Sequence, residues 1–162
     1  MFDLFGALFF VVALAPEPKI PVEYQEAWAT IPLRYRQLVT RVDLADHPGR
    51  AYRAELRVEV PRKVRASALV HEVMHVAMYA TPELERGWER TFWRDSRPLG
   101  WPQSKYGATN YREDFAEAAE ELHENGCLNE PLNAVPSREA FLRERVFRAE
   151  ELPTLPFGPC RR

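Results

Sequence analysis

The sequence predicts an α+β fold in which a small mixed or antiparallel sheet packs on one buried helix, with further helices towards the C-terminus. Two patterns lead to this prediction. Residues 51–60 alternate apolar and charged side chains with the period of a half-buried strand, and Pro61 ends the pattern. Residues 62–79 then change to helix formers that are apolar on almost every side, which is typical of a buried helix.

The N-terminal residues 1–21 are predicted to be a hydrophobic segment followed by a linker. The uncharged run from Leu4 to Ala15 is shorter than the roughly 20 residues of a membrane span and has the length of a signal-peptide core. The acidic Asp3 precedes it, and no Lys or Arg does. We expect an extracytoplasmic or membrane-tethered protein. The alternative is a cytoplasmic protein whose N-terminal arm packs on the domain.

Residues 22–152 are predicted to form one domain, followed by a proline-rich tail at 153–162. With 22 basic and 24 acidic residues, the chain has no electrostatic signature of a nucleic-acid partner. No pattern indicates an oligomeric state. The two cysteines, Cys127 and Cys160, could form a disulfide in an exported chain and would remain thiols in a reducing compartment, and the sequence does not decide between these states.

The other helices of this domain are predicted from breakers and caps. Residues 22–42 are expected to be helical, with an irregularity at Pro32. A short helix is expected from Thr81 to Arg94, with Pro82 at its first position, and a final helix over 136–150. The aromatic residues near the end of the short helix are expected to be core residues: Trp88, Phe92 and Trp93.

The segment His71-Glu72-Val73-Met74-His75 contains an H-E-x-x-H motif within the predicted buried helix. On a helix the two imidazoles lie one turn apart on one face and can converge on a single tetrahedral ion. A lone histidine on an apolar helix is usually an ordinary core residue, but the pair beside Glu72 favours a metal site. We predict Zn²⁺ bound by His71 and His75, with Glu72 as the general base.

A third protein ligand is needed, and the sequence limits the choice. The extended motif with a third histidine is absent, because Met78 and Thr81 stand where it requires Gly and His. His47 and His123 lie far from the motif in the sequence. A carboxylate downstream is therefore the expected third ligand.

A second group of residues lies about forty positions downstream of the motif. It consists of Tyr106-Gly107, Asn110 and the run Glu113-Asp114-Phe115-Ala116-Glu117. Together with H-E-x-x-H, this group resembles the catalytic domain of anthrax lethal factor and the related Pro-Pro endopeptidases. The resemblance covers roughly residues 50–125. It implies a zincin-like fold of the gluzincin type, with Glu113 as the third zinc ligand and Tyr106 as a hydrogen-bond donor to the reacting carbonyl.

The helix that carries Glu113 is predicted independently of that resemblance. Asn110 and Glu113 have the spacing of a capping box, and Gly126 provides a stop, so a helix is expected between them. Glu117 lies one turn after Glu113 on the same face, where it is expected to orient a ligand histidine through its outer nitrogen. The other glutamates of this helix are expected to be solvated: Glu120, Glu121 and Glu124.

These residues predict a zinc-dependent endopeptidase that acts on a peptide or protein substrate. Glu72 would activate a metal-bound water, and Tyr106 would donate to the developing oxyanion. The strand around residues 56–60 is expected to present its edge to an extended substrate. Two alternatives stay open: an inactive zinc-binding or interaction protein with this fold, and a metal-dependent amide hydrolase with a non-peptide substrate. Glu72 and Tyr106 argue against the inactive protein, because neither is a ligand.

Overall fold

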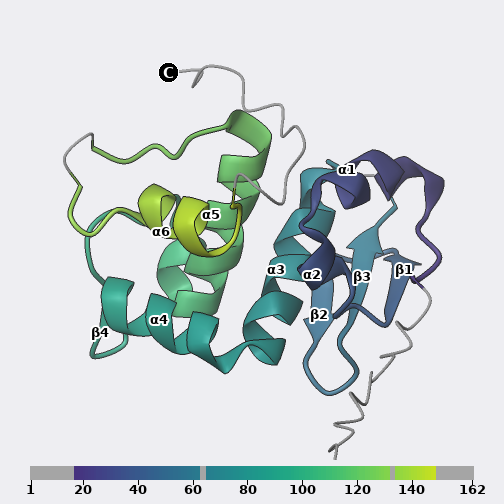
Figure 1. Ribbon diagram of the computed structural model, residues 1–162, viewed down its shortest axis with the longest axis horizontal. Coiled ribbons are helices and arrows are strands. Elements are labelled where there is room, and N and C mark those ends of the chain that lie inside the picture. The colour runs from purple at the N-terminus through teal and green to yellow at the C-terminus, as the bar shows by residue number, and fades with distance from the viewer. Residues whose placement is uncertain (1–16, 63–64, 132–133, 149–162) are drawn as a thin grey trace, which may run out of the picture.

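A computed structural model describes residues 17–62, 65–131 and 134–148. Helix α3 (Ser67–Ala80) lies at the centre of the molecule. The small sheet and the first helices cover one side of α3, and helices α4, α5 and α6 cover the other (Figure 1). The described residues therefore have a mixed α+β architecture, as the sequence predicts.

The main sheet has three strands in the order β1-β3-β2. Strand β1 (Arg41–Ala45) runs parallel to β3 (Arg57–Pro61), and β2 (Arg50–Tyr52) runs antiparallel to it. The sheet is thus mixed. The pattern expected to be one strand at 51–60 is two strands, joined by a tight turn in which Leu56 has a φ of 50°. Because β3 is the central strand, the prediction that residues 56–60 present a free edge is wrong.

The predicted helix over residues 22–42 is broken at Pro32, as expected, but its helical part ends earlier than predicted, at Arg36. A 3₁₀ turn, η1 (Val22–Tyr24), leads into α1 (Gln25–Thr30), and α2 (Leu33–Arg36) follows Pro32. Proline has no backbone N–H to donate within a helix, which accounts for the break. The last residues of the predicted helix belong instead to β1, where Val42 is buried opposite Val58 of β3.

Helix α3 is buried along almost its whole length, as its composition predicts. It packs on β3 with one face and on α5 with another. Val58 and Val60 of β3 are fully buried on this contact. The fully buried apolar residues of α3 occupy successive turns on several faces: Leu69, Val70, Val73, Met74, Val76, Ala77 and Met78.

Helix α4 (Pro82–Phe92) begins with the predicted proline and leads into a two-stranded hairpin, β4 (Trp93–Arg94) and β5 (Arg97–Pro98). Thr81 precedes the helix, but its side chain makes no capping hydrogen bond. The aromatic residues of this segment are core residues, as predicted, since Trp88 and Phe92 are fully buried and Trp93 is 7% exposed. Trp88 packs edge-to-face on Phe115 and Phe141.

Helix α5 (Tyr111–Asn125) has the predicted bounds. The side chain of Asn110 accepts hydrogen bonds from the N–H groups of Arg112 and Glu113, and Gly126 ends the helix with a φ of 73°. The 3₁₀ turn η2 (Gly107–Thr109) precedes this cap. Helix α6 (Arg138–Arg145) ends earlier than the predicted final helix.

Several predictions fall outside the described residues, among them the hydrophobic segment at 1–16 and the tail at 153–162. In the part of the chain that is described, no helix combines the length and apolarity needed to cross a bilayer. Cys127 is buried and is not a free thiol. Its predicted partner, Cys160, lies outside the described residues.

Candidate metal centre

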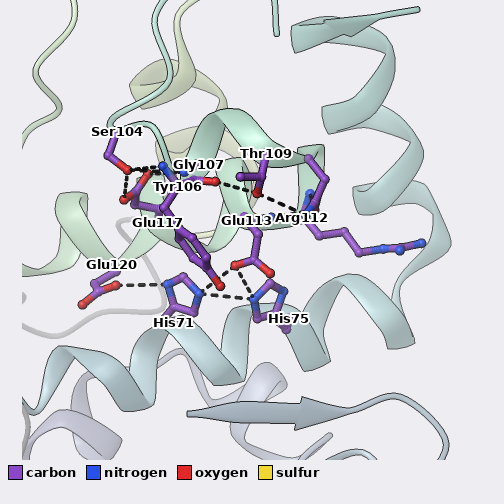
Figure 2. Close-up of polar contacts among 11 residues, drawn as sticks. His71, His75, Ser104, Tyr106, Gly107, Thr109, Arg112, Glu113, Glu117 and Glu120 are labelled. Atoms are coloured by element: carbon purple, nitrogen blue, oxygen red, sulfur yellow. Dashed lines mark hydrogen bonds and ion pairs between the residues drawn. The ribbon is translucent and has the colours of Figure 1, made fainter. Parts of the chain in front are cut away.

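The metal ligands expected from the sequence come together where α3 faces the first turn of α5. Figure 2 shows His71 and His75 side by side on α3, with the carboxylate of Glu113 directed at both. Oε2 of Glu113 lies 3.2 Å from Nε2 of His71 and 3.3 Å from Nε2 of His75. The two Nε2 atoms are 3.2 Å apart. These three atoms form a nearly equilateral triangle, and the residues are a possible ligand set for a metal ion.

The size of the triangle fits a tetrahedral metal. Bonds of about 2.0–2.1 Å to nitrogen and oxygen place tetrahedral ligands about 3.3–3.4 Å apart. The three separations, 3.2, 3.2 and 3.3 Å, are close to that value. Two imidazoles and one carboxylate are also a donor set suited to divalent transition metals. The arrangement can therefore hold such an ion without a large movement of either helix.

The hydrogen bonds of His71 indicate that a positive charge, a proton or a metal cation, lies between its Nε2 and the carboxylate of Glu113. Its Nδ1 lies 3.0 Å from Glu120, so a neutral ring that donates there presents the lone pair of Nε2 to the carboxylate of Glu113. Two lone pairs at 3.2 Å repel unless a proton or a metal cation lies between them. Burial lowers the pKa of His71, but its hydrogen bonds with Glu113 and Glu120 outweigh burial and raise it to about 10.

The other two members of the triangle have the charge states of metal ligands. Burial lowers the pKa of His75, so its ring stays neutral, and among the described residues its Nδ1 has no hydrogen-bond partner. Burial alone would raise the pKa of Glu113, but hydrogen bonds with His71 and His75 hold that pKa well below its usual value. A neutral imidazole and an ionised carboxylate are the forms that coordinate metals.

Glu120 makes a contact that the sequence did not predict. Its Oε2 pairs with Nδ1 of His71 at 3.0 Å, and its Oε1 accepts a hydrogen bond from the hydroxyl of Ser67 at 2.8 Å. The prediction that Glu120 is solvated is wrong, and its side chain is 27% exposed. Glu120 lies seven residues after Glu113, which is two helical turns, so helical spacing was the available signal. A carboxylate at the outer nitrogen fixes the orientation of a ligand histidine.

Glu117 has a different role from the one expected of it. It contacts neither histidine; its carboxylate accepts hydrogen bonds from the hydroxyl of Ser104 at 2.6 Å and from the N–H of Gly107 at 3.1 Å. A Cβ on Gly107 would collide with the same carboxylate. The prediction that Glu117 orients a histidine is therefore wrong. Glu117 instead fixes the position of the segment that carries Tyr106, through its hydrogen bonds to Ser104 and Gly107 (Figure 2).

From this segment Tyr106 extends over the triangle formed by Nε2 of His71, Nε2 of His75 and Oε2 of Glu113. Its ring centroid lies 6.3 Å from that of His71, and Figure 2 shows its hydroxyl directed towards the three ligand atoms. Burial of the hydroxyl and its hydrogen bond to Glu113 raise the pKa of Tyr106 to about 12. The residue as a whole is 56% exposed. A protonated hydroxyl is thus held beside the ligands, on a side chain that solvent can reach.

Glu72 lies in the same turn of α3 but is not a member of the triangle. The residue is only 7% exposed, and its carboxylate lies against Gly49, just before β2. A Cβ at position 49 would overlap that carboxylate, so the close approach requires glycine. Burial raises the pKa of Glu72 to about 7, even though the charge of His71 acts in the opposite direction.

Asp114 was not recognised from the sequence, yet it is the most buried charge beside the site. It is fully buried and accepts hydrogen bonds from the indole N–H groups of Trp88 and Trp93 at 3.1 and 2.8 Å. The guanidinium of Arg138 pairs with it at 2.9 Å. Asp114 follows Glu113 directly, so this network anchors the turn of α5 that presents the ligand carboxylate. Nothing in the spacing of these residues identifies the network in advance.

Comparison with known proteins adds no relative. No family model, curated protein or solved structure matches the chain. The case for the site therefore rests on its own geometry, and membership of the lethal factor family stays a hypothesis.

Proposed function

We propose that the protein is a zinc metallopeptidase with a zincin-like fold of the gluzincin type. The observation that carries this proposal is the convergence of Glu113 of α5 on His71 and His75 of α3, the helix that also holds Glu72. The three candidate ligand atoms lie within 3.3 Å of one another. The donor set and its tetrahedral spacing support zinc as the metal. Three protein ligands leave a fourth position for water or substrate, which is the pattern of a catalytic site.

The residues around the ligands support hydrolysis of a peptide bond. A zinc ion held by His71, His75 and Glu113 would supply Lewis acidity and would lower the pKa of a water molecule towards neutrality. Glu72, with a pKa of about 7, accepts the proton of the attacking water and returns it to the leaving amine. Tyr106 is protonated at neutral pH and donates to the carbonyl oxygen as negative charge develops there.

The sheet supports an extended peptide as the substrate. Among the described residues strand β2 pairs with one neighbour, β3, and Gly49 just before β2 lies against the carboxylate of Glu72. A peptide that adds to the other edge of β2 therefore runs beside the general base. Backbone pairing of this kind favours an endopeptidase, because it recognises chain on both sides of the scissile bond.

The proposal is tested by measuring metal content and peptide-library cleavage for wild type, Glu72→Ala and Glu113→Ala. We expect stoichiometric zinc and cleavage in wild type, zinc without cleavage in Glu72→Ala, and weakened zinc binding in Glu113→Ala. Glu124→Gln, in the last turn of α5, is the matched control and is expected to behave as wild type. Zinc without cleavage in wild type would favour an inactive binding protein, and a wild type that binds no zinc would refute the metal site.

A further inference from the structure

The face of α3 that holds the two histidines continues to Tyr79. His71, His75 and Tyr79 are spaced four residues apart, and a helix rises about 6 Å over four residues. The rings of His75 and Tyr79 are stacked, with centroids 6.1 Å apart and an interplanar angle of 16°. Tyr79 is therefore the next side chain along this face after the proposed ligands.

Two arginines from separate elements lie at the ring of Tyr79. Arg53, in the turn after β2, has its guanidinium carbon 5.5 Å from the ring centroid, and Arg112, in the first turn of α5, has its guanidinium carbon 6.0 Å away. The guanidinium of Arg112 also lies 4.9 Å from the ring of Tyr111. Aromatic rings thus support both cations at the same end of the α3 face.

One carboxylate holds both arginines in place. Glu85 of α4 accepts from Nε of Arg112 at 2.8 Å, pairs with its Nη2 at 2.7 Å, and lies 3.7 Å from Nη2 of Arg53. The hydroxyl of Tyr111 donates to the same carboxylate at 2.9 Å. Two guanidinium groups therefore share the carboxylate of Glu85.

The two arginine side chains are more exposed to solvent than the carboxylate that they share. The side chain of Glu85 is only 12% exposed, whereas those of Arg53 and Arg112 are 61% and 35% exposed. A ligand that approaches this end of α3 therefore meets guanidinium groups before it meets the carboxylate.

We propose that Arg53 and Arg112 form a subsite for a carboxylate of the substrate, about two residues from the scissile bond. This inference rests on the proposed peptidase function. An extended peptide advances about 3.3 Å per residue, so the step of roughly 6 Å from His75 to Tyr79 corresponds to about two residues. The carboxylate belongs either to an Asp or Glu side chain or to the C-terminus of the substrate. Guanidinium groups bind both through paired hydrogen bonds.

The test uses zinc-loaded, full-length protein and matched peptides that carry Asp or Asn at each of the three positions on either side of the cleaved bond. Each peptide is made with a free and with an amidated C-terminus. We expect kcat/KM to favour the carboxylate at one position by about tenfold or more, as for a charge-assisted hydrogen bond. Persistence of this preference in amidated peptides identifies a side-chain carboxylate. Its restriction to free-acid peptides identifies the C-terminus.

The arginines are tested with Arg53→Gln, with the double variant that adds Arg112→Gln, and with Arg53→Glu. The double variant is expected to lose the carboxylate preference, and Arg53→Glu is expected to shift it towards Lys at the same position. Arg41→Gln, an exposed arginine of β1, is the control and is expected to retain the preference. Arg53 lies in an exposed turn, so its variants test the subsite even if a change at Arg112 weakens α5.

A binding assay separates this inference from the proposed function. Fluorescent versions of the same peptides are titrated into Glu72→Ala protein and followed by anisotropy, which requires no hydrolysis. Carboxylate-selective binding that depends on the two arginines, without cleavage by wild type, would reject the peptidase and keep the subsite. Equal treatment of Asp and Asn peptides in both assays, or a preference that survives the double variant, would reject the subsite.

Discussion

Replacement of Glu120 by Gln is expected to weaken metal binding without removing a ligand. The carboxylate of Glu120 is fixed between Nδ1 of His71 at 3.0 Å and the hydroxyl of Ser67 at 2.8 Å. Glutamine preserves the size of the side chain and one carbonyl oxygen. In the wild type, the negative charge of Glu120 keeps a proton on Nδ1 of His71, and the lone pair of Nε2 therefore faces Glu113. Glutamine removes that charge.

The size of the effect follows from the change in hydrogen-bond type. A hydrogen bond to a charged group contributes about 1.5–3 kcal/mol, and a neutral one contributes about 0.5–1.5 kcal/mol. The loss of about 1–1.5 kcal/mol corresponds to a zinc Kd that is about 5- to 15-fold higher. Glu120→Ala removes the partner altogether and is expected to raise Kd by about 10- to 100-fold.

The assay is a competition titration against a chromophoric zinc chelator, with three glutamates of α5 compared. Glu124→Gln is the control, because Glu124 pairs only distantly with Arg65, at 3.7 Å, and is expected to bind zinc as wild type does. Glu117→Gln is expected to leave Kd unchanged and to lower turnover, since Glu117 holds the Tyr106 segment. Wild-type affinity in Glu120→Gln, or a larger loss of affinity in Glu117→Gln, would refute this assignment.

Three further predictions follow from the same geometry. Gly49→Ala is expected to lower kcat with zinc content unchanged, because the added Cβ displaces the carboxylate of Glu72; normal kcat would contradict this contact. Asp114→Asn is expected to lower the free energy of unfolding, measured by urea denaturation, by about 3–5 kcal/mol, because it leaves Arg138 buried without its counter-ion. A decrease below about 1 kcal/mol would contradict this. Zinc affinity is expected to rise with pH by up to about tenfold per unit, because a pKa of about 10 keeps a proton on His71 that the metal must displace. Calorimetry in buffers of different ionisation enthalpy should detect about one released proton for each zinc ion bound.

Local signals in the sequence predicted the helices that carry the site. Asn110 and Gly126 mark the ends of α5 through chemistry within one turn, a capping side chain at one end and a left-handed glycine at the other. The spacing of His71 and His75 places both rings on one face of α3. Such features depend on residues three or four positions apart, so the sequence alone suffices for them.

The sheet was harder to predict because its pairing is non-local. Residues 53–56 contain no Gly, Pro, Asn or Asp to mark the turn between β2 and β3, so the alternating pattern continues through it. Strand β1 is short and is stabilised by its pairing with β3, which lies beyond β2 in the sequence. Strand propensity reflects such neighbours more than it reflects the strand itself.

The choice between Glu117 and Glu120 also depended on tertiary structure. Both lie close to the face of α5 that holds Glu113, so helical periodicity admits either as the partner of His71. The angle and offset at which α5 crosses α3 decide which of them reaches Nδ1. Those quantities are set by the packing of Phe115, Ala116 and Ala119, which are fully buried, and no spacing rule gives them.

The carboxylate of Glu113, the proposed third ligand, is oriented by the next residue, Asp114, which points away from the candidate metal site. Successive residues on a helix differ by about 100° in direction, so a helix that turns Glu113 towards α3 turns Asp114 towards another part of the core. There Asp114 accepts hydrogen bonds from three residues, Trp88, Trp93 and Arg138, and a rotation of α5 would leave it buried without them. A buried ion pair adds little net stability compared with apolar packing, but it has a narrow range of acceptable geometries. The network therefore restricts the rotation of α5 about its axis, and that restriction is what holds Oε2 of Glu113 at 3.2 and 3.3 Å from the two histidines.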